Sequence, residues 1–274
     1  MQNYFKAKAK LFENLYSGDF AVINADDSYA SQFLERISAG VNVYTYGIKM
    51  PADVKAENII FDDNGASFTC IIKDKKYNIH LKMNGMFSVY NALAAITVAL
   101  AQSFDMETSI KTLETINGVA GRFEIITNKP TVIVDYAHTP DGLENVLKAA
   151  REITPKEGKL ICVFGCGGDR DATKRPKMGA IAENLADKVI VTSDNPRSED
   201  PQQIITDILA GLKSVNNVIV EPDRELAIKE ANKITNINDV VVVAGKGHED
   251  YQILANETIH FDDREKVREI FTGV

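Results

Sequence analysis

The stretch "KVIVTSDNPRSEDP", residues 188–201, joins a short apolar run to a polar loop. The β-branched run at 189–191 is typical of a buried strand, and Asp194, Asn195 and Arg197 follow where that strand must end. Asx-Pro sequences commonly begin turns, so a solvated loop leaving a sheet explains these residues taken alone. The function of the loop depends on whether other strands bring similar loops to the same place.

The same pattern recurs throughout the chain after residue 118. Helical patterns such as "TPDGLENVLKAAREI" (139–153) and "PQQIITDILAGLK" (201–213) separate the apolar runs. Strands rich in Val and Ile that alternate with crossover helices are typical of a parallel, doubly wound α/β sheet. The other runs are "TVIVDYA" (131–137), "KLICVFG" (159–165), "NVIVEPD" (217–223) and "DVVVVAGK" (239–246).

Four of these predicted strands end in polar or glycine-rich clusters. In such sheets ligands bind beyond the carboxyl ends of the strands, and those ends share one edge. A solvated loop needs polar residues, but it does not need Arg170, Arg197, His138, His248 and Glu249 to converge. The sequence therefore predicts a binding site, built from the clusters at 135–141, 165–171, 193–200 and 244–250.

The first part of the chain has a different pattern. Residues 42–82 alternate apolar and polar positions between turn signals, which predicts antiparallel strands joined by hairpins. Residues 87–102 are apolar almost all round, which predicts a buried helix, and glycines at 117–124 suggest a linker. The predicted domains are 1–117 and 118–274. Further helices are expected at 3–16, 29–39 and 106–116, and a strand at 20–26.

Composition narrows the class of protein. The chain has 274 residues, of which 45% are hydrophobic and 26% charged, with a net charge of −8. This balance argues against a general nucleic-acid or membrane-surface binder, which would need a basic face. The chain has no apolar stretch of about 20 residues and no signal-peptide pattern, so a cytoplasmic protein is expected. Cys70, Cys162 and Cys166 are interpreted as reduced, buried side chains.

A dinucleotide-binding enzyme is the alternative that the glycines raise. "VFGCGGDR" resembles the start of that fingerprint, but Arg170 stands at the third glycine. Asp194 would then be the ribose-binding acid of an NAD-dependent enzyme. The chain contains no G-x-x-x-x-G-K-[ST] phosphate loop, so ATP hydrolysis by this chain alone is not expected.

Four long motifs taken together resemble the Mur ligases of peptidoglycan synthesis, in particular those that add meso-2,6-diaminopimelate. They are "IVDYAHTPDGLENVL", "CVFGCGGDRDATKRPKMGAIAE", "VTSDNPRSEDP" and "VVVAGKGHEDYQ". "MQNYFKAKAKLF", "VINADD", "GMFSVYNALAA" and "GVAGRFE" fit the same family. The resemblance implies that 1–117 is the C-terminal part of the central ATP-binding domain. It also implies that 118–274 is the Rossmann-like, amino-acid-binding C-terminal domain.

The resemblance further implies an ATP- and Mg²⁺-dependent amide ligase. Its small-molecule substrates would be ATP, meso-diaminopimelate and a UDP-N-acetylmuramoyl dipeptide, with neither nucleic acid nor membrane involved. Arg197 would bind the second carboxylate of diaminopimelate through two parallel hydrogen bonds, a group that lysine lacks. Arg170 would hold a carboxylate, Asn195 and Glu249 the amino-acid end, and Asp194 would orient its neighbours. The implied substrate-binding residues are Arg170, Asp194, Asn195, Arg197, Gly245 and Glu249.

Other positions match the nucleotide and metal residues of the family. Lys8 corresponds to a catalytic lysine that, once carbamylated, acts as a carboxylate toward Mg²⁺. Each of these positions also has a purely structural alternative. Lys8 would lie on a solvated basic face of its helix, and Asn91 would only contact the local backbone. Arg122 would anchor a hinge, and His138 would cap a helix. Two departures are Ala120, where the family has Pro, and Ser88, where it has Asn. The implied nucleotide-binding residues are Asn91, Arg122, Asp135, Tyr136 and His138. A non-catalytic amino-acid-binding module stays open as a further alternative.

Overall fold

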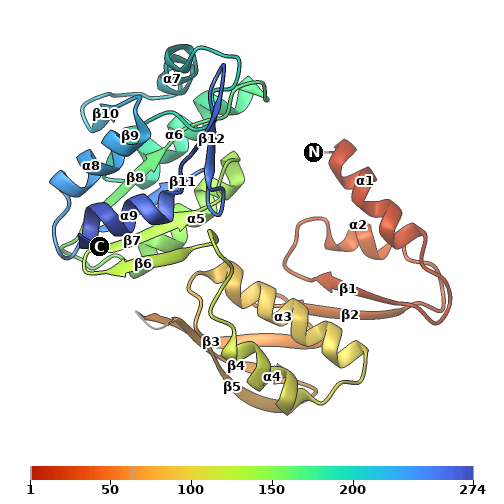
Figure 1. Ribbon diagram of the computed structural model, residues 1–274. Coiled ribbons are helices and arrows are strands. Elements are labelled where there is room, and N and C mark those ends of the chain that lie inside the picture. Colours follow the sequence, from red (N-terminus) through yellow and green to blue (C-terminus); the bar gives the residue numbers. More distant parts are fainter. Residues whose placement is uncertain (1, 63–64, 274) are drawn as a thin grey trace. The chain divides into compact units, whose positions relative to one another are not determined.

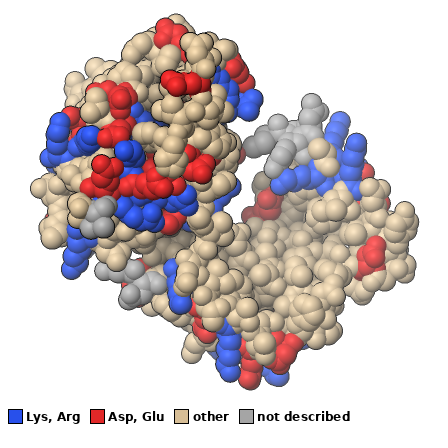
Figure 2. Space-filling view, in the orientation of Figure 1, with Lys and Arg blue, Asp and Glu red and all other residues tan. Residues whose placement is uncertain are grey.

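The computed structural model describes residues 2–62 and 65–273, and the chain divides into two compact units, Met1–Asn117 and Gly118–Val274 (Figure 1). Both are α/β, as the sequence predicts. Acidic and basic side chains are interspersed on the visible surface of the second unit, without an extended basic patch (Figure 2). None of the described helices is long and apolar enough to cross a membrane.

The first unit is a five-stranded sheet with helices packed on it. The core lies between α3 and strands β3 to β5, and includes Phe68, Leu81 and Leu93. Phe5 of α1 stacks on Tyr29 at 5.3 Å, next to α2. The strands, in spatial order, are β1 (Phe20–Asn24), β2 (Asn42–Gly47), β3 (Val54–Asp62), β4 (Gly65–Ile72) and β5 (Lys75–Leu81). The helices are α1 (Gln2–Glu13), α2 (Ala30–Leu34), α3 (Met86–Ala101) and α4 (Met106–Thr115).

Three predictions for this unit need correction. β3, β4 and β5 are antiparallel as expected, but β2 runs parallel to both β1 and β3. The alternation of apolar and polar residues indicates which face of the sheet a residue occupies, but not whether neighbouring strands run parallel or antiparallel. In the structure, Asp26 holds the segment after β2 by accepting three backbone N–H groups at 48–50. The predicted helix at 29–39 extends only over α2. α3 is not buried all round, because Asn91, Ala95 and Val98 are exposed on one face.

The turns between the antiparallel strands were also predicted. At 73–74 the chain makes a two-residue hairpin turn, in which Lys73 and Asp74 have φ of 45° and 69°. This left-handed pair is the geometry that matches the twist of a hairpin. The other predicted turn, at residues 63–64, lies outside the described residues.

The second unit is built on a six-stranded sheet of order β10-β9-β8-β11-β7-β6. The five predicted strands are all present and parallel, and β6, which the sequence analysis missed, is an antiparallel edge strand. The strands are β6 (Glu124–Asn128), β7 (Thr131–Asp135), β8 (Leu160–Phe164), β9 (Lys188–Val191), β10 (Val218–Val220) and β11 (Val240–Ala244). A short hairpin of β12 (Tyr251–Ile253) and β13 (Thr258–His260) follows.

Helices cover both faces of this sheet (Figure 1). On one face α8 and α9 pack on alternate strand residues such as Val134, Val163 and Val243. Helices α5, α6 and α7 cover the opposite face. They connect β7 to β8, β8 to β9 and β9 to β10, which all advance in one direction along the sheet, whereas α8 connects β10 back to β11. Because such crossovers are right-handed, a reversal of direction places the helix on the other face. The helices are α5 (Pro140–Ile153), α6 (Arg175–Leu185), α7 (Pro201–Leu209), α8 (Arg224–Ile234) and α9 (Asp263–Thr272), with a 3₁₀ turn η1 (Ala172–Lys174) before α6.

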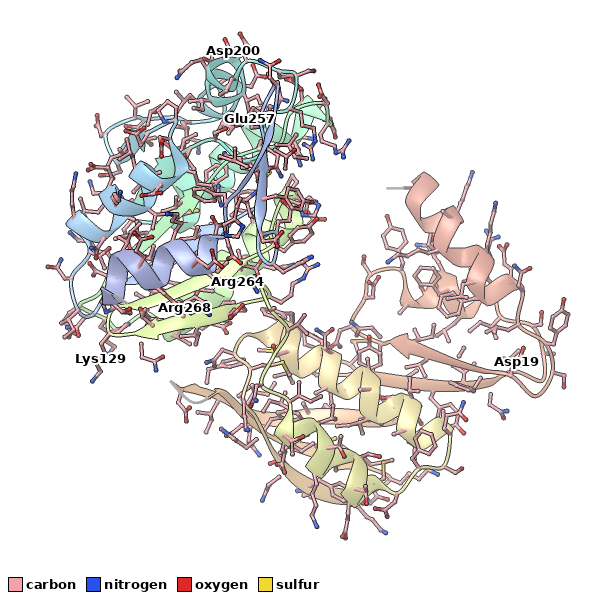
Figure 3. All side chains as sticks on the ribbon, viewed as in Figure 1. Asp19, Lys129, Asp200, Glu257, Arg264 and Arg268 are labelled. Carbon is pink, nitrogen blue, oxygen red and sulfur yellow. The ribbon has the colours of Figure 1, made fainter. Side chains whose placement is uncertain are left out.

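Local sequence signals fix where these helices begin. Thr139 caps α5 by accepting the N–H of Gly142, and a proline follows at the first helical position. Asp200 caps α7 in the same way by accepting the N–H of Gln202. Figure 3 labels Asp200. Each cap marks the end of the loop that follows β7 or β9. The caps therefore fix the length of the loops that lie at the carboxyl edge of the sheet. The doubly wound fold therefore places the four polar clusters at one edge, as predicted.

Candidate functional site: a cleft at the carboxyl edge of the sheet

A cleft of about 600 Å³ opens beyond the carboxyl ends of β7, β8, β9 and β11. Its walls come from the four predicted clusters, together with residues 173–177 at the start of α6 and Tyr251 of β12. β11 returns between β7 and β8, so loops that are distant in sequence meet at this edge. The six predicted substrate-binding residues all line it: Arg170, Asp194, Asn195, Arg197, Gly245 and Glu249.

Arg197 is anchored at one edge of its guanidinium. Nη1 donates to the carbonyl oxygens of Gly168 at 2.9 Å and of Asn195 at 3.3 Å. Among the described residues, Nε and Nη2 have no hydrogen-bond partner. The backbone of Arg197 has a φ of 53°, and its N–H donates to the carbonyl of Ile253. The side chain is therefore fixed on its backbone side and can still bind a carboxylate.

Asn195 links three segments around the cleft. Its Nδ2 donates to Oε2 of Glu249 at 2.9 Å, and its Oδ1 accepts from Nζ of Lys246 at 3.2 Å and from the N–H of Ile253 at 2.9 Å. Lys246 Nζ also lies 3.4 Å from Glu249 Oε2. Asn195 thus orients Glu249, whose carboxylate is 14% exposed at the cleft.

Buried charges lie beneath this layer. Burial raises the pKa of Asp194 and lowers that of Lys246, whereas the attraction between the two side chains opposes both shifts. Arg224, fully buried, also faces Asp194, and it pairs with Asp263 through two bonds of 2.8 Å. The buried acidic and basic side chains beneath the cleft therefore neutralise one another, rather than being neutralised by contact with water.

Gly245 is required where it stands. Its φ is 123°, and a Cβ there would lie 2.6 Å from Oδ2 of Asp194. No other residue type allows β11 to turn away so close to that carboxylate.

Aromatic and cationic side chains form a second cluster around Tyr136. Arg122 lies over its ring at 4.6 Å, and the rings of His138 and His248 lie 4.6 and 5.2 Å away. Tyr136 and His138 line the cleft. The alternative of a helix cap for His138 is wrong, because Thr139 is the cap, and His138 Nδ1 instead contacts the carbonyl of Tyr136 at 2.8 Å.

Asp135 uses its carboxylate on the protein itself. The N–H groups of Phe123 and Ala137 donate to it at 2.7 and 2.8 Å, and it is 8% exposed. Burial raises its pKa, although these two bonds oppose the shift. This geometry holds the segment that carries Arg122 against β7.

The remaining predicted residues belong to the first unit. Lys8 is exposed on α1, between the buried Phe5 and Ala9. Asn91 is exposed on α3 rather than in a buried helix. Ser88 donates its hydroxyl to the carbonyl of Asn84 at 2.7 Å, so it serves the start of α3.

The glycines after β8 do not form an open dinucleotide loop. A Cβ on Gly165 would lie 2.4 Å from the carbonyl oxygen of Thr192, and one on Gly168 would lie 1.9 Å from that of Pro196. They allow the loop after β8 to pack on the loop after β9, which is the loop of Asp194 and Arg197. The glycine-rich segment after β8, which suggested an NAD-dependent enzyme, therefore does not support that alternative.

Sequence reasoning missed several residues of the site. Lys246 is fully buried, and its position two residues after the end of the apolar run of β11 could have signalled this. Lys174 and Lys177 line the cleft from the segment that begins α6, and Lys174 Nζ donates to the carbonyl of His138 at 2.7 Å. Tyr251 comes from the hairpin that no pattern indicated.

No group of three or more His, Cys, Asp or Glu within 2–62 and 65–273 is placed to hold a metal ion. The three cysteines are buried and free, and burial raises the pKa of Cys70 to about 12.

Two family profiles match the chain in order: the Mur ligase middle domain over residues 1–99 and the Mur ligase glutamate ligase domain over 121–247. A UDP-N-acetylmuramoyl-L-alanyl-D-glutamate–2,6-diaminopimelate ligase of Clostridium botulinum is 49% identical, covering 100% of this chain and 56% of the relative. The ligase of the same name from Thermosynechococcus vestitus is 47% identical, covering 98% and 54%. The chain thus spans about half the length of these curated relatives.

Solved structures agree with this assignment. A UDP-N-acetylmuramoyl-L-alanyl-D-glutamate–2,6-diaminopimelate ligase superposes with a TM-score of 0.66 at 35% identity, covering 99% of this chain and 56% of the other. The MurF ligase of Thermotoga maritima, solved with ADP, gives a TM-score of 0.72 at 17% identity over 99% of this chain and 57% of the other, and supports the fold alone. With both domain profiles matched in order and relatives identical at nearly half of all positions, the chain belongs to the Mur ligase family.

Proposed function

We propose that this chain is part of a cytoplasmic, ATP-dependent ligase that adds meso-2,6-diaminopimelate to UDP-N-acetylmuramoyl-L-alanyl-D-glutamate in peptidoglycan synthesis. The two curated relatives described above are named as ligases of UDP-N-acetylmuramoyl-L-alanyl-D-glutamate and 2,6-diaminopimelate. The observation that carries the proposal is the anchored guanidinium of Arg197, with Nε and Nη2 left for a ligand at a cleft that also presents Glu249. A dicarboxylic diamino acid matches both groups.

In this proposal the second unit binds the amino acid. Arg197, on the loop after β9, binds the second carboxylate of diaminopimelate through two hydrogen bonds. Arg170, on the loop after β8, also binds a carboxylate of the ligand. Glu249 receives an ammonium group, while Asn195 and Asp194 hold Glu249 and the glycine turn at Gly245 in place. ATP first transfers its terminal phosphoryl group to the D-glutamate side-chain carboxylate, and ADP leaves. The neutral amine then attacks this acyl phosphate; the C–N bond forms as the C–O bond to phosphate breaks, and the nitrogen loses a proton to give the amide.

The nucleotide side of the reaction is also a proposal. Asn91, Arg122, Asp135, Tyr136 and His138 would serve ATP, with Tyr136 and Arg122 offering a stacked surface and Asp135 acting through the segment that it holds. Lys8, once carbamylated, would supply one carboxylate-like ligand to Mg²⁺, whose charge would offset that of the phosphates. The first unit would then be the C-terminal part of the ATP-binding domain.

Binding of two amino acids to this chain tests the proposal. By calorimetry, meso-diaminopimelate should bind at least about tenfold more tightly than L-lysine, because lysine leaves Arg197 unpaired. Arg197→Ala should weaken diaminopimelate binding by about 2–4 kcal/mol, and Arg197→Lys should recover only part of it. Two results would contradict the proposal. One is that the wild type binds meso-diaminopimelate and L-lysine with equal affinity. The other is that Arg197→Ala leaves the affinity for meso-diaminopimelate unchanged.

The open alternative is a module that binds an amino acid without catalysis. Because this chain contains no phosphate loop, its Mg²⁺-dependent ATP turnover should stay at background. Turnover above background would show that it hydrolyses ATP by other means.

A further inference from the structure

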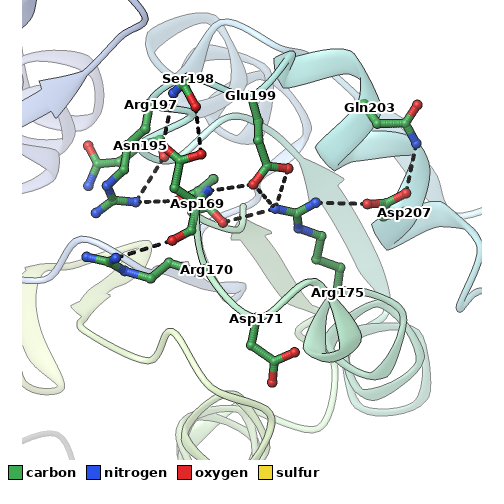
Figure 4. A network of polar contacts seen from close by, with 12 residues as sticks. Asp169, Arg170, Asp171, Arg175, Asn195, Arg197, Ser198, Glu199, Gln203 and Asp207 are labelled. Atoms are coloured by element: carbon green, nitrogen blue, oxygen red, sulfur yellow. Dashed lines mark hydrogen bonds and ion pairs between the residues drawn. The ribbon is translucent and has the colours of Figure 1, made fainter.

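Arg175 is a buried arginine next to the cleft that the proposed reaction does not use. It begins α6, its side chain is 2% exposed, and it is not one of the described residues that line the cleft. Its Nη2 lies 2.8 and 2.9 Å from the two carboxylate oxygens of Glu199, and its Nη1 lies 2.9 Å from Asp207 Oδ2 (Figure 4). Nη2 also donates to the carbonyl of Gly167 at 3.4 Å. One guanidinium therefore joins the loop after β8, the loop after β9 and helix α7.

Glu199 extends this attachment between the two loops. It accepts the backbone N–H of Asp169, whose own carboxylate accepts the N–H of Ser198 at 3.2 Å and its hydroxyl at 2.7 Å. The N–H of Gly168 donates to the carbonyl of Asn195 at 2.9 Å. The loops are thus bonded to each other on both sides of Arg197 (Figure 4).

Arg197 has a backbone conformation that needs such support. A non-glycine residue in the left-handed region is strained, and it persists where the surroundings hold it. Arg197 has a φ of 53°, and its guanidinium rests on the carbonyl of Gly168, next to Asp169. Loosening Glu199, two residues further along, would release both the backbone of Arg197 and the carbonyl that anchors it.

The burial of Arg175 is not explained by stability alone. Its Nε is buried without a hydrogen-bond partner, which is a cost in free energy. A buried charged pair is also commonly no more stabilising than apolar residues of similar volume. An arginine here is better explained by the geometry that it imposes on the two loops.

We propose that Arg175 is a positioning residue for amino-acid selectivity: by holding Glu199 and Asp207 it keeps the guanidinium of Arg197 aligned with the far carboxylate of a diamino dicarboxylic acid. This inference rests on the proposed function. Arg175 acts through Arg197 and does not touch the ligand.

A double-mutant cycle on this chain tests the inference, with meso-diaminopimelate and L-lysine as the two ligands measured by calorimetry. Arg175→Met should reduce the preference for diaminopimelate at least about tenfold while changing L-lysine affinity less than about twofold. In an Arg197→Ala background the same substitution should have no further effect. Arg175→Lys should not restore the preference, because one ammonium cannot bridge both carboxylates in this geometry.

Controls separate positioning from loss of fold. Arg151→Met removes an exposed arginine that pairs with Asp187 at 2.9 Å in the same unit, and it should leave the preference unchanged. If Arg175→Met does not fold, Glu199→Gln and Asp207→Asn weaken the same contacts individually and should each reduce the preference.

The outcomes distinguish the two proposals. A wild type without preference for diaminopimelate, or an Arg197→Ala variant that keeps it, would overturn the proposed function. If those two behave as expected, the inference is overturned where the Arg175, Glu199 and Asp207 variants keep the preference, where they weaken both ligands equally, or where their effect adds to that of Arg197→Ala.

Discussion

Gly245 illustrates how one residue can determine the geometry of the cleft. Its positive φ and the 2.6 Å approach of Asp194 to the position of a Cβ act together, so any side chain must move a buried carboxylate that Arg224 and Lys246 help to neutralise. The residue contributes no chemical group. It matters because it leaves space.

We expect Gly245→Ala to lower the free energy of unfolding by about 2–4 kcal/mol, the sum of a strained φ and a clash with a buried carboxylate. Gly273→Ala is the matched control, because Gly273 has a φ of 73° but nothing within 4 Å of its Cβ position. That variant should lose only about 1 kcal/mol. Urea denaturation measures the free energy of unfolding of both variants. Equal decreases would mean that the Asp194 side chain moves away from the new Cβ without a cost in stability.

At the scale of elements, the loops after β8 and β9 depend on carboxylates that must stay ionised. The hydrogen bond from Arg175, followed by that from Gln203, lowers the pKa of Asp207 below its ordinary value of 3.8. The hydroxyl of Ser198 does the same for Asp169. A carboxyl group whose folded pKa is lowered stabilises the fold above its unfolded pKa, and this contribution is lost as the pH falls through the folded value.

The free energy of unfolding should therefore fall as the pH is lowered from about 5 to about 3, and Asp207→Asn should make that fall shallower. Denaturant titrations at several pH values measure the slope. Glu157→Gln, which removes an exposed carboxylate from the loop after α5, controls for net charge. An unchanged slope in Asp207→Asn would show that the contact with Arg175 does not depend on ionisation.

For the whole molecule, the buried pair of Arg224 and Asp263 fastens the second unit together. Both side chains are 0% exposed, and the guanidinium also donates to the carbonyls of Ser193 and Ala244 at 3.2 and 3.0 Å. The pair thereby joins α8 and α9 to the ends of β9 and β11. Each unit has its own hydrophobic core, so the effect of breaking the pair should be local.

Asp263→Ala should destabilise the second unit by about 3–5 kcal/mol, because Arg224 is left as an uncompensated buried charge. Hydrogen exchange followed by mass spectrometry should show lost amide protection in β8, β9 and β11, with β3 to β5 unchanged. The double variant Arg224→Met, Asp263→Leu should recover much of the loss. Equal loss of protection in both units would contradict local stabilisation.

The sequence alone determined the five parallel strands of the second unit, the edge at which their loops meet and, through the family resemblance, six residues that line the cleft. It could do so because β-branched runs encode buried strands, and parallel strands place their carboxyl ends together. The caps of α5 and α7, Thr139 and Asp200, are also local to the sequence, because a cap is a contact within one turn of chain, although the sequence analysis had raised only His138 as a cap.

Only the tertiary structure decided which side chains meet within that edge. Asn195 and Glu249 are 54 positions apart and Arg175 and Asp207 are 32 apart, and nothing local to either residue specifies the other. The parallel pairing of β2 and the missed edge strand β6 were equally beyond pattern reasoning. Periodicity reports the face on which a residue lies, whereas strand order, pairing direction and charge pairing follow from packing the whole chain.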